Sequence, residues 1–216
     1  MLEKMGEFFD RRLSSYDEHM MTNIASAEEF YPFTASLLPK ARGARVLDLG
    51  CGTGLELASY FECNPSAKIV GVDLAPGMLA ELQRKFSDRD VRLILGSYFD
   101  LPLGENAFDA AVSVESLHHF TKTEKIPLYR KIFAALKDRG YFILTDYFAS
   151  TDEEEASLRA ELLHLKKEQG IADDAFYHFD TPLTVAHECE ALSEAGFSKI
   201  EVLSAWGATH TIKAVK

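Results

Sequence analysis

The sequence lacks the features that mark secreted and membrane-spanning proteins. Its three cysteines, Cys51, Cys63 and Cys189, are odd in number and have neither metal-site spacing nor the pattern of a disulfide framework. No apolar run approaches the length of a membrane span, and residues 2–7 are too polar for a secretory signal. These absences predict a protein of the reducing cytoplasm that does not enter the membrane.

Basic charge is also scarce. The chain of 216 residues has 23 Lys and Arg against 34 Asp and Glu, a formal net charge of −11. A nucleic-acid substrate or an anionic membrane surface calls for a basic face, so this balance argues against both. Repeats and low-complexity linkers are missing, and the length suits one domain with a full core.

A glycine-rich turn at residues 50–54 is the strongest local signal. Val46, Leu47 and Leu49 predict a short buried strand before it, and residues 55–61 begin a helix after it. Glycines let the backbone bend sharply and approach a ligand without an interfering Cβ. The helix start behind such a turn offers free N–H groups and a positive dipole end.

Two acids stand at the ends of neighbouring predicted strands. Asp48 lies just before the turn, where a carboxylate binds a cation or an ammonium group but repels a pyrophosphate. Asp73 ends the strand 68–73, 19 residues after Gly54, where nucleotide-binding α/β units hold the two ribose hydroxyls with an acid. The plainer alternative is a tight turn in an α/β protein of another function.

Apolar spacing predicts alternating helices and strands along the chain. The last two strands are expected to form a hairpin, and Thr181 with Pro182 is expected to cap the helix before them. The expected strands are 46–49, 68–73, 91–95, 108–113, 140–147, 200–203 and 209–215. The expected helices cover 2–21, 27–38, 54–63, 76–86, 122–136, a stretch from the acids at 152–155 to Gly170, and a stretch from Thr181 to Gly196.

These motifs resemble those of class I S-adenosylmethionine (SAM)-dependent methyltransferases of the small-molecule type. The resemblance implies an α/β, Rossmann-like doubly wound fold with a seven-stranded, mostly parallel sheet, an antiparallel last strand and a helical lid. Two positions depart from the family pattern. Arg139 stands where the family usually has the first of two glycines, and Ser97 stands near the place where the family often has an acid that binds the adenine. The matching motifs are residues 46–54, 71–79, 108–120 and 136–148, within a similarity that runs from about Arg45 to Lys216.

The resemblance also implies a division of the chain. We expect one methyltransferase domain over residues 1–216. Its parts are an N-terminal helical lid (1–40), a SAM-binding core (41–148), a lid insertion (149–182) and a C-terminal helix with a strand hairpin (183–216).

SAM is the implied cofactor. Asp73 is expected on its ribose, Asp48 on its ammonium group, and the backbone of Gly50 and Gly52 against its amino-acid part. Tyr16 is expected to face its carboxylate, and otherwise to be a half-buried lid residue. The full expected cofactor set is Tyr16, Asp48, Gly50, Cys51, Gly52, Gly54, Asp73, Leu74, Met78, Ser97, Tyr98 and Glu115.

The acceptor side is expected at the carboxyl ends of the fourth and fifth strands. His118 and His119 are candidate general bases, because neutral imidazole can take a proton from an oxygen or nitrogen, and at least one of them is expected to serve packing instead. Tyr147 is expected to contact the acceptor, as are Tyr177 and His178 in an aromatic, acidic run within the lid insertion.

The sequence thus predicts methyl transfer from SAM to an O, N or C atom of a small molecule, by an in-line displacement that needs no metal. Two alternatives come from other functional classes. One is a non-catalytic SAM-binding regulator. The other is a dinucleotide-dependent oxidoreductase, against which the placement of Asp48 beside the glycine turn argues. Neither nucleic-acid nor membrane partners are expected, and the protein is expected to be a monomer or a homodimer.

Overall fold

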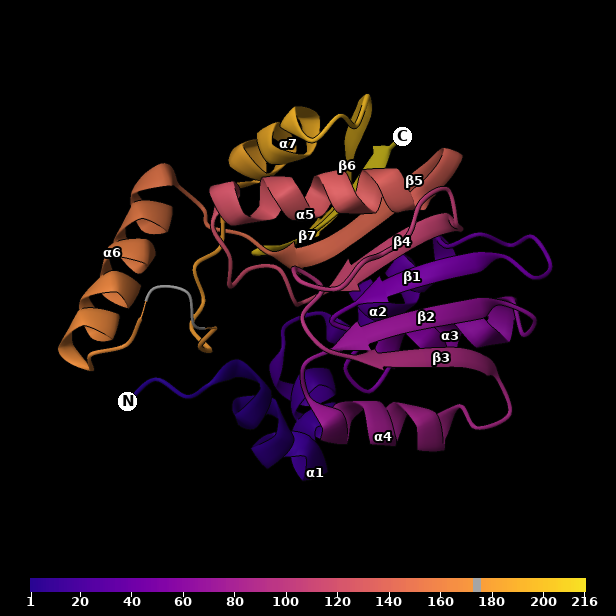
Figure 1. The fold of residues 1–216 in the computed structure, drawn as a ribbon, viewed down its shortest axis with the longest axis horizontal. Helices are drawn as coiled ribbons and strands as arrows, with labels where there is room; N and C mark the ends of the chain where they lie inside the picture. Colours follow the sequence, from indigo (N-terminus) through magenta and orange to yellow (C-terminus); the bar gives the residue numbers. More distant parts are fainter. Residues whose placement is uncertain (173–175) are drawn as a thin grey trace.

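A seven-stranded sheet lies at the centre of the computed structural model, which describes residues 1–172 and 176–216 (Figure 1). The strand order is β3-β2-β1-β4-β5-β7-β6; the first five are parallel, and β7 is antiparallel to both β5 and β6. The predicted sheet with its antiparallel last strand is therefore confirmed. The strands are β1 (Arg45–Leu49), β2 (Lys68–Asp73), β3 (Asp90–Leu95), β4 (Phe108–Val114), β5 (Leu136–Tyr147), β6 (Lys199–Trp206) and β7 (Thr209–Val215).

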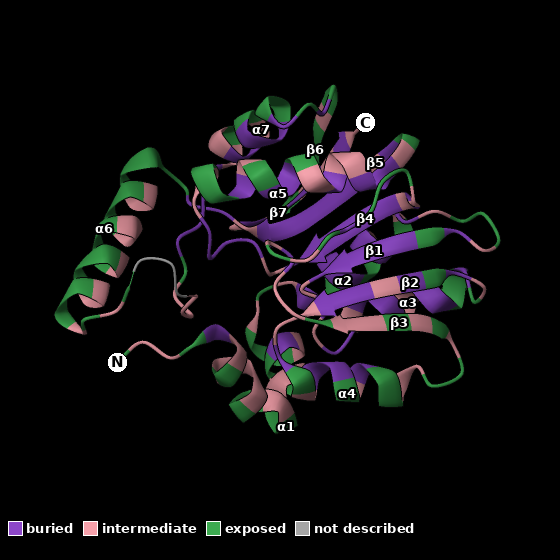
Figure 2. Ribbon diagram, in the orientation of Figure 1, coloured by how far each residue is buried: buried purple, intermediate pink, exposed green. Residues whose placement is uncertain are grey.

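Helices cover both faces of this sheet, and the central strands are buried between them (Figure 2). Alternate residues of each strand enter different cores, as the period of a strand requires. Leu47 packs in the core under α5 and α7, whereas Val46 packs in the core under α2, α3 and α4. The helices are α1 (Met5–Asn23), α2 (Ala27–Ser36), α3 (Leu55–Cys63), α4 (Pro76–Lys85), α5 (Lys122–Ala135), α6 (Asp152–Glu168) and α7 (Val185–Glu194).

A buried ion pair joins α5 to α7. The Lys125 ammonium lies 2.5 Å from the Glu188 carboxylate, and the Tyr129 hydroxyl donates to the second oxygen of the same carboxylate. Lys125 and Glu188 are 1% and 0% exposed. Each charge is thus held in the interior by a partner that satisfies it.

The parallel register aligns the ends of the strands. Asp48 of β1 is opposite Gly71 of β2 and Val112 of β4. The turns that follow these strands therefore meet at one edge of the sheet, where ligands bind in open α/β folds.

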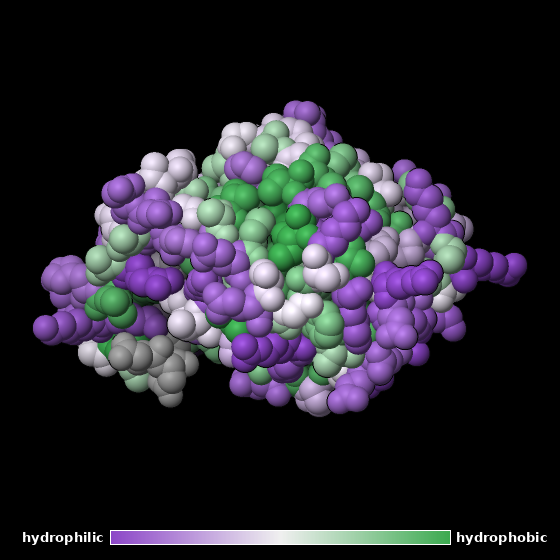
Figure 3. Space-filling model, turned by 90° about the horizontal axis from the view of Figure 1, so that it is seen from above, coloured by the Kyte–Doolittle hydropathy of each residue, from purple (hydrophilic) through white to green (hydrophobic). Residues whose placement is uncertain are grey.

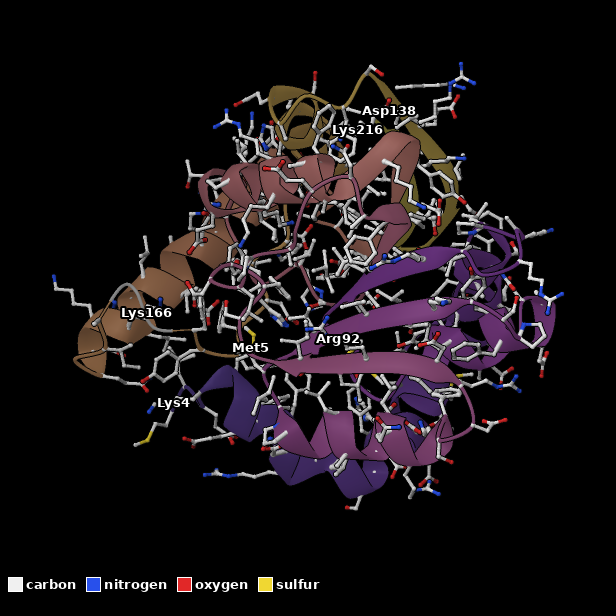
Figure 4. All side chains as sticks on the ribbon, turned by 45° about the vertical axis from the view of Figure 1, so that its right-hand side comes forward. Lys4, Met5, Arg92, Asp138, Lys166 and Lys216 are labelled. Atoms are coloured by element: carbon white, nitrogen blue, oxygen red, sulfur yellow. The ribbon has the colours of Figure 1, made fainter. Side chains whose placement is uncertain are left out.

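Two segments far apart in sequence cover that edge together. The Met5 N–H donates to the Phe176 carbonyl (3.1 Å), and the His178 N–H donates to the Glu3 carbonyl (3.0 Å). Figure 4 labels Lys4 and Met5 where α1 begins, beside this junction. The start of α1 is thereby tied to the segment that precedes α7.

Helix α6 stands away from the sheet (Figure 1). None of its 17 residues, all of them described, is buried (Figure 2). The leucines of α6 therefore have no core to pack against within the described part of the chain.

No helix among the described residues is both long and apolar enough to cross a membrane. Seen from above in Figure 3, hydrophobic residues gather in the middle of the face and hydrophilic residues surround them.

Two local expectations are corrected by the structure. The fifth strand begins at Leu136, not at residue 140, because Leu136 pairs with Phe108 ahead of a register shift. Arg139 lies within this irregularity at φ +63°, a conformation that favours glycine and that explains the usual glycine there. The cap of α7 is Thr184, not Thr181, since the Thr184 hydroxyl accepts from the His187 N–H (3.4 Å).

Candidate functional site

The glycine turn after β1 has a left-handed backbone, with φ of +70°, +47° and +74° at Gly50, Gly52 and Gly54. A Cβ on Gly50 would lie 2.0 Å from the Ser116 hydroxyl, so any side chain there clashes with the turn after β4. A Cβ on Gly52 would instead meet only the Tyr16 ring, at van der Waals distance, with the hydroxyl at 3.8 Å. The missing side chain of Gly50 thus allows close packing against Ser116, whereas the missing side chain of Gly52 leaves room between its backbone and Tyr16.

Asp73, at the end of β2, holds this turn in place. One carboxylate oxygen accepts from the Gly52 N–H (2.9 Å), and the other accepts from the Ala75 N–H (2.8 Å) at the start of α4. Burial raises the pKa of Asp73, and these N–H donors partly oppose the rise. The carboxylate therefore connects two adjoining turns and retains further acceptor positions.

Beneath the turn lies a buried pair of acids. Asp48 and Glu56 are 1% and 4% exposed, and the Asp48 Oδ2 and Glu56 Oε1 atoms have no hydrogen-bond partner among the described residues. Burial raises the pKa of both carboxyls, and the neighbouring Glu56 raises that of Asp48 further. The pair disfavours two negative charges and would be stabilised by a shared proton or a nearby cation.

Tyr16 lies above this region in an acidic environment. Burial raises the pKa of its hydroxyl, and so do the charges of Asp73, Glu56, Glu115 and Asp17. A hydroxyl that stays neutral amid four carboxylates marks a place where positive charge is favoured.

A small cavity of about 40 Å³ opens over the turn. Eight of the twelve expected cofactor residues line it. Its lining comprises Met5, Phe9, Tyr16, Gly50, Gly52, Asp73, Leu74, Met78, Tyr98, Glu115, Ser116 and His119.

The four remaining expected residues lie elsewhere. Asp48 is buried beneath the turn, and Cys51 packs against Gly71 in the core. Gly54 is close to side chains of α3 and α4, where its lack of a Cβ serves helix packing. The Ser97 hydroxyl accepts from the Phe99 N–H (3.1 Å) and so closes its own turn.

A larger cavity of about 800 Å³ adjoins the small one. The two share Phe9, Tyr16, Glu115 and His119, so they form one continuous site. The lining of the larger cavity is Phe8, Phe9, Arg12, Ser15, Tyr16, His19, Met20, Asn23, Ile24, Ala25, Ser26, Glu115, His118, His119, Tyr147, His178, Asp180, Trp206, Gly207, Ala208 and Thr209.

The expected acceptor residues divide into two groups. Tyr147 and His178 line the larger cavity, and the His178 ring stacks on Phe8 at a centroid distance of 3.5 Å. Tyr177 is not among the described lining residues; it forms an isolated backbone bridge with Lys4. The aromatic run thus contributes alternate residues to the cavity.

The two histidines after β4 are buried and meet carboxylates from two other segments. His118 Nδ1 lies 2.6 Å from Asp146 Oδ1 at the end of β5. Asp180 Oδ1 lies 3.5 Å from His118 Nε2 and 3.2 Å from His119 Nδ1. The backbone sets this position of Asp180, because the Thr181 N–H donates to the His118 carbonyl (2.9 Å).

The surroundings separate the pKa values of the site groups. Burial opposes charge on His118, but the carboxylates of Asp146 and Asp180 outweigh it and raise its pKa. Burial and the neighbouring His118 lower the pKa of His119. Burial, helped by Asp146, raises the pKa of Glu115 to about 7. At neutral pH these directions favour a charged His118 beside a neutral His119.

Several of these groups were not among the expected site residues. Asp146 and Asp180 had a positional signal, since one ends a strand and the other belongs to the acidic, aromatic run. Glu56 looked like an ordinary acid in the first turn of a helix. Residues 206–209, at the hairpin between β6 and β7, carried no signal that they would line the site.

Comparison with known proteins agrees with this geometry. A family model described as a methyltransferase domain matches residues 46–140. The chain is 25% identical over 229 aligned positions to a carboxy-S-adenosyl-L-methionine synthase of Nitratiruptor sp., and this alignment covers 100% of the chain and 95% of that protein. It is 28% identical to a demethylmenaquinone methyltransferase of Symbiobacterium thermophilum over 63% of the chain and 56% of that protein.

A solved structure shows the same fold. The crystal structure of a candidate O-methyltransferase from Nostoc punctiforme superposes with a TM-score of 0.73 at 23% identity, and the match covers 99% of this chain. The chain spans 62% of the length of that protein. The match over residues 46–140 shows a SAM-dependent methyltransferase domain, the strand order is that of the class I fold, and S-adenosylmethionine is the cofactor that enzymes of this family use.

Proposed function

We propose that this enzyme transfers the methyl group of SAM to an oxygen, nitrogen or carbon atom of a small molecule bound in the larger cavity. The observation that carries the proposal is the junction of the two cavities. The glycine turn and Asp73 lie on one side, and candidate bases stand where the cavities meet.

The polar end of the cofactor is assigned to the acids around the turn. Asp73 has acceptor positions left for the two ribose hydroxyls. The unpartnered oxygens of Asp48 and Glu56, with the acidic surroundings of Tyr16, fit the positive charges of SAM. Asp48 is buried, so its effect on the ammonium group is by charge or through water rather than by open contact.

The adenine end is assigned to Leu74, Met78 and Tyr98. The Tyr98 hydroxyl lies 3.2 Å from the Ser116 hydroxyl, and its ring is next to Gly50. A cavity of about 40 Å³ is smaller than a nucleoside. Cofactor entry therefore requires side chains such as Met5 and Phe9 of α1 to move aside.

The acceptor is assigned to the larger cavity, because its volume suits a small molecule. SAM supplies a methyl group on a positively charged sulfur. As the acceptor atom forms its bond to this carbon, the carbon–sulfur bond breaks and its electron pair stays on sulfur as a neutral thioether. Where the acceptor atom carries a proton, His119 or Glu115 takes it, since both line the junction.

The lining also limits the class of acceptor. Aromatic and apolar side chains such as Phe9, Met20 and Trp206 provide much of the wall. The carboxylates Glu115 and Asp180 oppose a negatively charged group unless a cation accompanies it. A partly apolar acceptor that is neutral or carries an amine fits this lining best.

Synthesis of a carboxylated SAM is a second candidate, favoured by the full-length match to proteins named for that reaction. A carboxylate in the cavity would need a basic partner. Arg12 is the arginine of the lining, and it already pairs with Glu3 at 3.2 Å. Because Arg12 is already paired, we favour methyl transfer over the synthesis of a carboxylated SAM.

One mass-spectrometric assay separates the candidates. The enzyme is incubated with SAM and a panel of small metabolites, and S-adenosylhomocysteine, methylated products and carboxylated SAM are measured. Methyl transfer requires the first two to appear in equal amounts. Carboxylated SAM without a methylated product would replace the proposal by the second candidate.

The acceptor assignment has its own test. His178→Ala should lower turnover of the identified acceptor at least tenfold and change SAM affinity less than threefold, because His178 lines only the larger cavity. The matched control is His164→Ala, an exposed histidine on α6. Full turnover by a folded His178→Ala enzyme would place the acceptor elsewhere.

A further inference from the structure

We propose that His118, His119 and Asp180 bind a divalent transition-metal ion, such as Zn²⁺, at the wall of the acceptor cavity. The ligand atoms are His118 Nε2, His119 Nδ1 and Asp180 Oδ1. All three lie within 4.8 Å of one another. Two imidazoles and one carboxylate form a common ligand set for zinc and for other first-row metals.

The spacing of these atoms matches a coordination shell. The Asp180 oxygen lies 3.2 Å from the His119 nitrogen and 3.5 Å from the His118 nitrogen. Bonds of about 2.1 Å in tetrahedral geometry place neighbouring ligand atoms roughly 3.4 Å apart. An ion can therefore enter between the three groups with small side-chain movements.

A second observation distinguishes this cluster from an ordinary ion pair. The other ring nitrogen of His118, Nδ1, is held at 2.6 Å by Asp146, which is 1% exposed. The two oxygens of Asp146 also accept the N–H groups of Leu117 (2.8 Å) and Tyr147 (2.9 Å). A carboxylate on the far nitrogen orients a metal-binding histidine. Because His118 is charged at neutral pH, a metal ion would bind at Nε2 by displacing the proton there.

The ligands come from segments whose positions are already fixed. His118 and His119 are 8% and 7% exposed, and Asp180 is held by the Thr181–His118 backbone bond. His119 Nδ1 also lies 3.2 Å from the Phe179 carbonyl. The ligand role requires the tautomer of His119 with its proton on Nε2, so Glu115 is the base of the proposed transfer when the metal is bound.

The ion would face the acceptor, because all three ligands line the larger cavity. With three protein ligands, at least one coordination position remains for a bound molecule. An acceptor with an oxygen donor, such as an enolate, a phenolate or a carboxylate beside the methylated atom, would fill it. This role in positioning rests on the proposed function, whereas metal binding itself does not.

The test measures metal binding directly. Protein without an affinity tag is stripped with EDTA and titrated with Zn²⁺ by calorimetry, and with Co²⁺ by visible absorption. We expect one equivalent to bind, with cobalt bands typical of nitrogen and oxygen ligation. His119→Gln and Asp180→Asn should each weaken binding at least a hundredfold, and Asp146→Asn about 10- to 100-fold.

His164→Gln is the matched control, since this exposed histidine also lies beside a carboxylate, that of Glu168 (3.3 Å). It should leave metal affinity unchanged. A cooperative melting transition serves as the check that each variant is folded.

Two results would overturn the metal site: failure of the wild-type protein to bind one equivalent, or binding by the folded His119→Gln and Asp180→Asn variants at wild-type strength. Methyl transfer that persists in EDTA, together with failed metal binding, would reject the metal and keep the proposed function. Tight metal binding without methyl transfer to any acceptor would keep the metal site and reject the proposed function.

Discussion

Replacing Glu56 by glutamine should make the protein more stable and weaken its hold on SAM. Both effects come from the same pair of buried carboxyls. In the folded protein without cofactor, Asp48 and Glu56 face each other with one unpartnered oxygen each among the described residues. A glutamine amide at position 56 can donate to Asp48 and removes one of the two charges.

The stability gain follows from the cost of an unpaired buried polar atom, about 1–3 kcal/mol. For a chain of this size, 1 kcal/mol shifts the melting temperature by about 2–4 °C. Glu56→Gln should therefore raise the melting temperature of the cofactor-free protein by roughly 4–8 °C at pH 8, taking about 2 kcal/mol.

The gain should depend on pH in a defined direction. The pKa of each carboxyl is raised by folding, so the folded protein holds protons that the unfolded chain releases. Wild-type stability is then complete below the ordinary pKa range of carboxyls and falls as pH rises through the raised values. The difference between variant and wild type should shrink toward pH 4.

The effect on the cofactor has the opposite sign. The pair acts on the ammonium group by charge or through water, so removing one of its charges should lower the affinity for SAM or S-adenosylhomocysteine roughly 10- to 100-fold. Scanning calorimetry from pH 4 to pH 8.5 and titration calorimetry measure the two effects. Glu62→Gln, an exposed acid on the same helix, is the matched control and should change neither.

Equal melting temperatures of Glu56→Gln and wild type at pH 8 would refute the account of the buried charges. A gain that stays constant from pH 4 to pH 8 would refute its assignment to ionisation. Unchanged cofactor affinity would show that the pair does not face the ammonium group.

Three further outcomes are expected. Asp73→Asn should weaken S-adenosylhomocysteine binding about 10- to 100-fold in titration calorimetry, because the charge-assisted bonds to the ribose are lost; wild-type affinity in a folded variant would remove the ribose assignment. Gly52→Val should abolish cofactor binding yet leave a cooperative melting transition, since its Cβ clashes with no protein atom but adopts a strained φ of +47°; retained binding would show that this backbone does not touch the cofactor. Glu188→Ala should lower the free energy of unfolding by about 3–5 kcal/mol in denaturant titrations, because it leaves the Lys125 charge buried and alone; a loss below 1 kcal/mol would mean that water reaches Lys125.

Much of the fold could be predicted because it depends on local patterns. Residues buried on both faces of a parallel sheet read as continuous apolar runs, and the glycine turn has few other uses. The antiparallel last strand was implied by family resemblance, and the structure confirms it. The start of the fifth strand was missed because the pairing of Leu136 with Phe108 depends on a register that no local pattern encodes.

Half of the site was visible in the same way. Asp73 ends a strand and Gly50 and Gly52 follow one, so sequence position fixes where their backbone lies. Tyr177 and His178 looked equivalent in the sequence. Only the docking of residues 176–178 on the start of α1 turns His178 toward the cavity while Tyr177 pairs with Lys4.

The sequence by itself determined the alternation of strands and helices, the glycine turn and the acid that follows β2, because each depends on neighbours a few residues away. The tertiary structure alone decided which acids act together. Glu56 meets Asp48 around the glycine turn, and Asp180 meets His118 and His119 from a segment much further along the chain. Charges and burial act through space, so their effect on ionisation and ligand binding appears only once the packing is known.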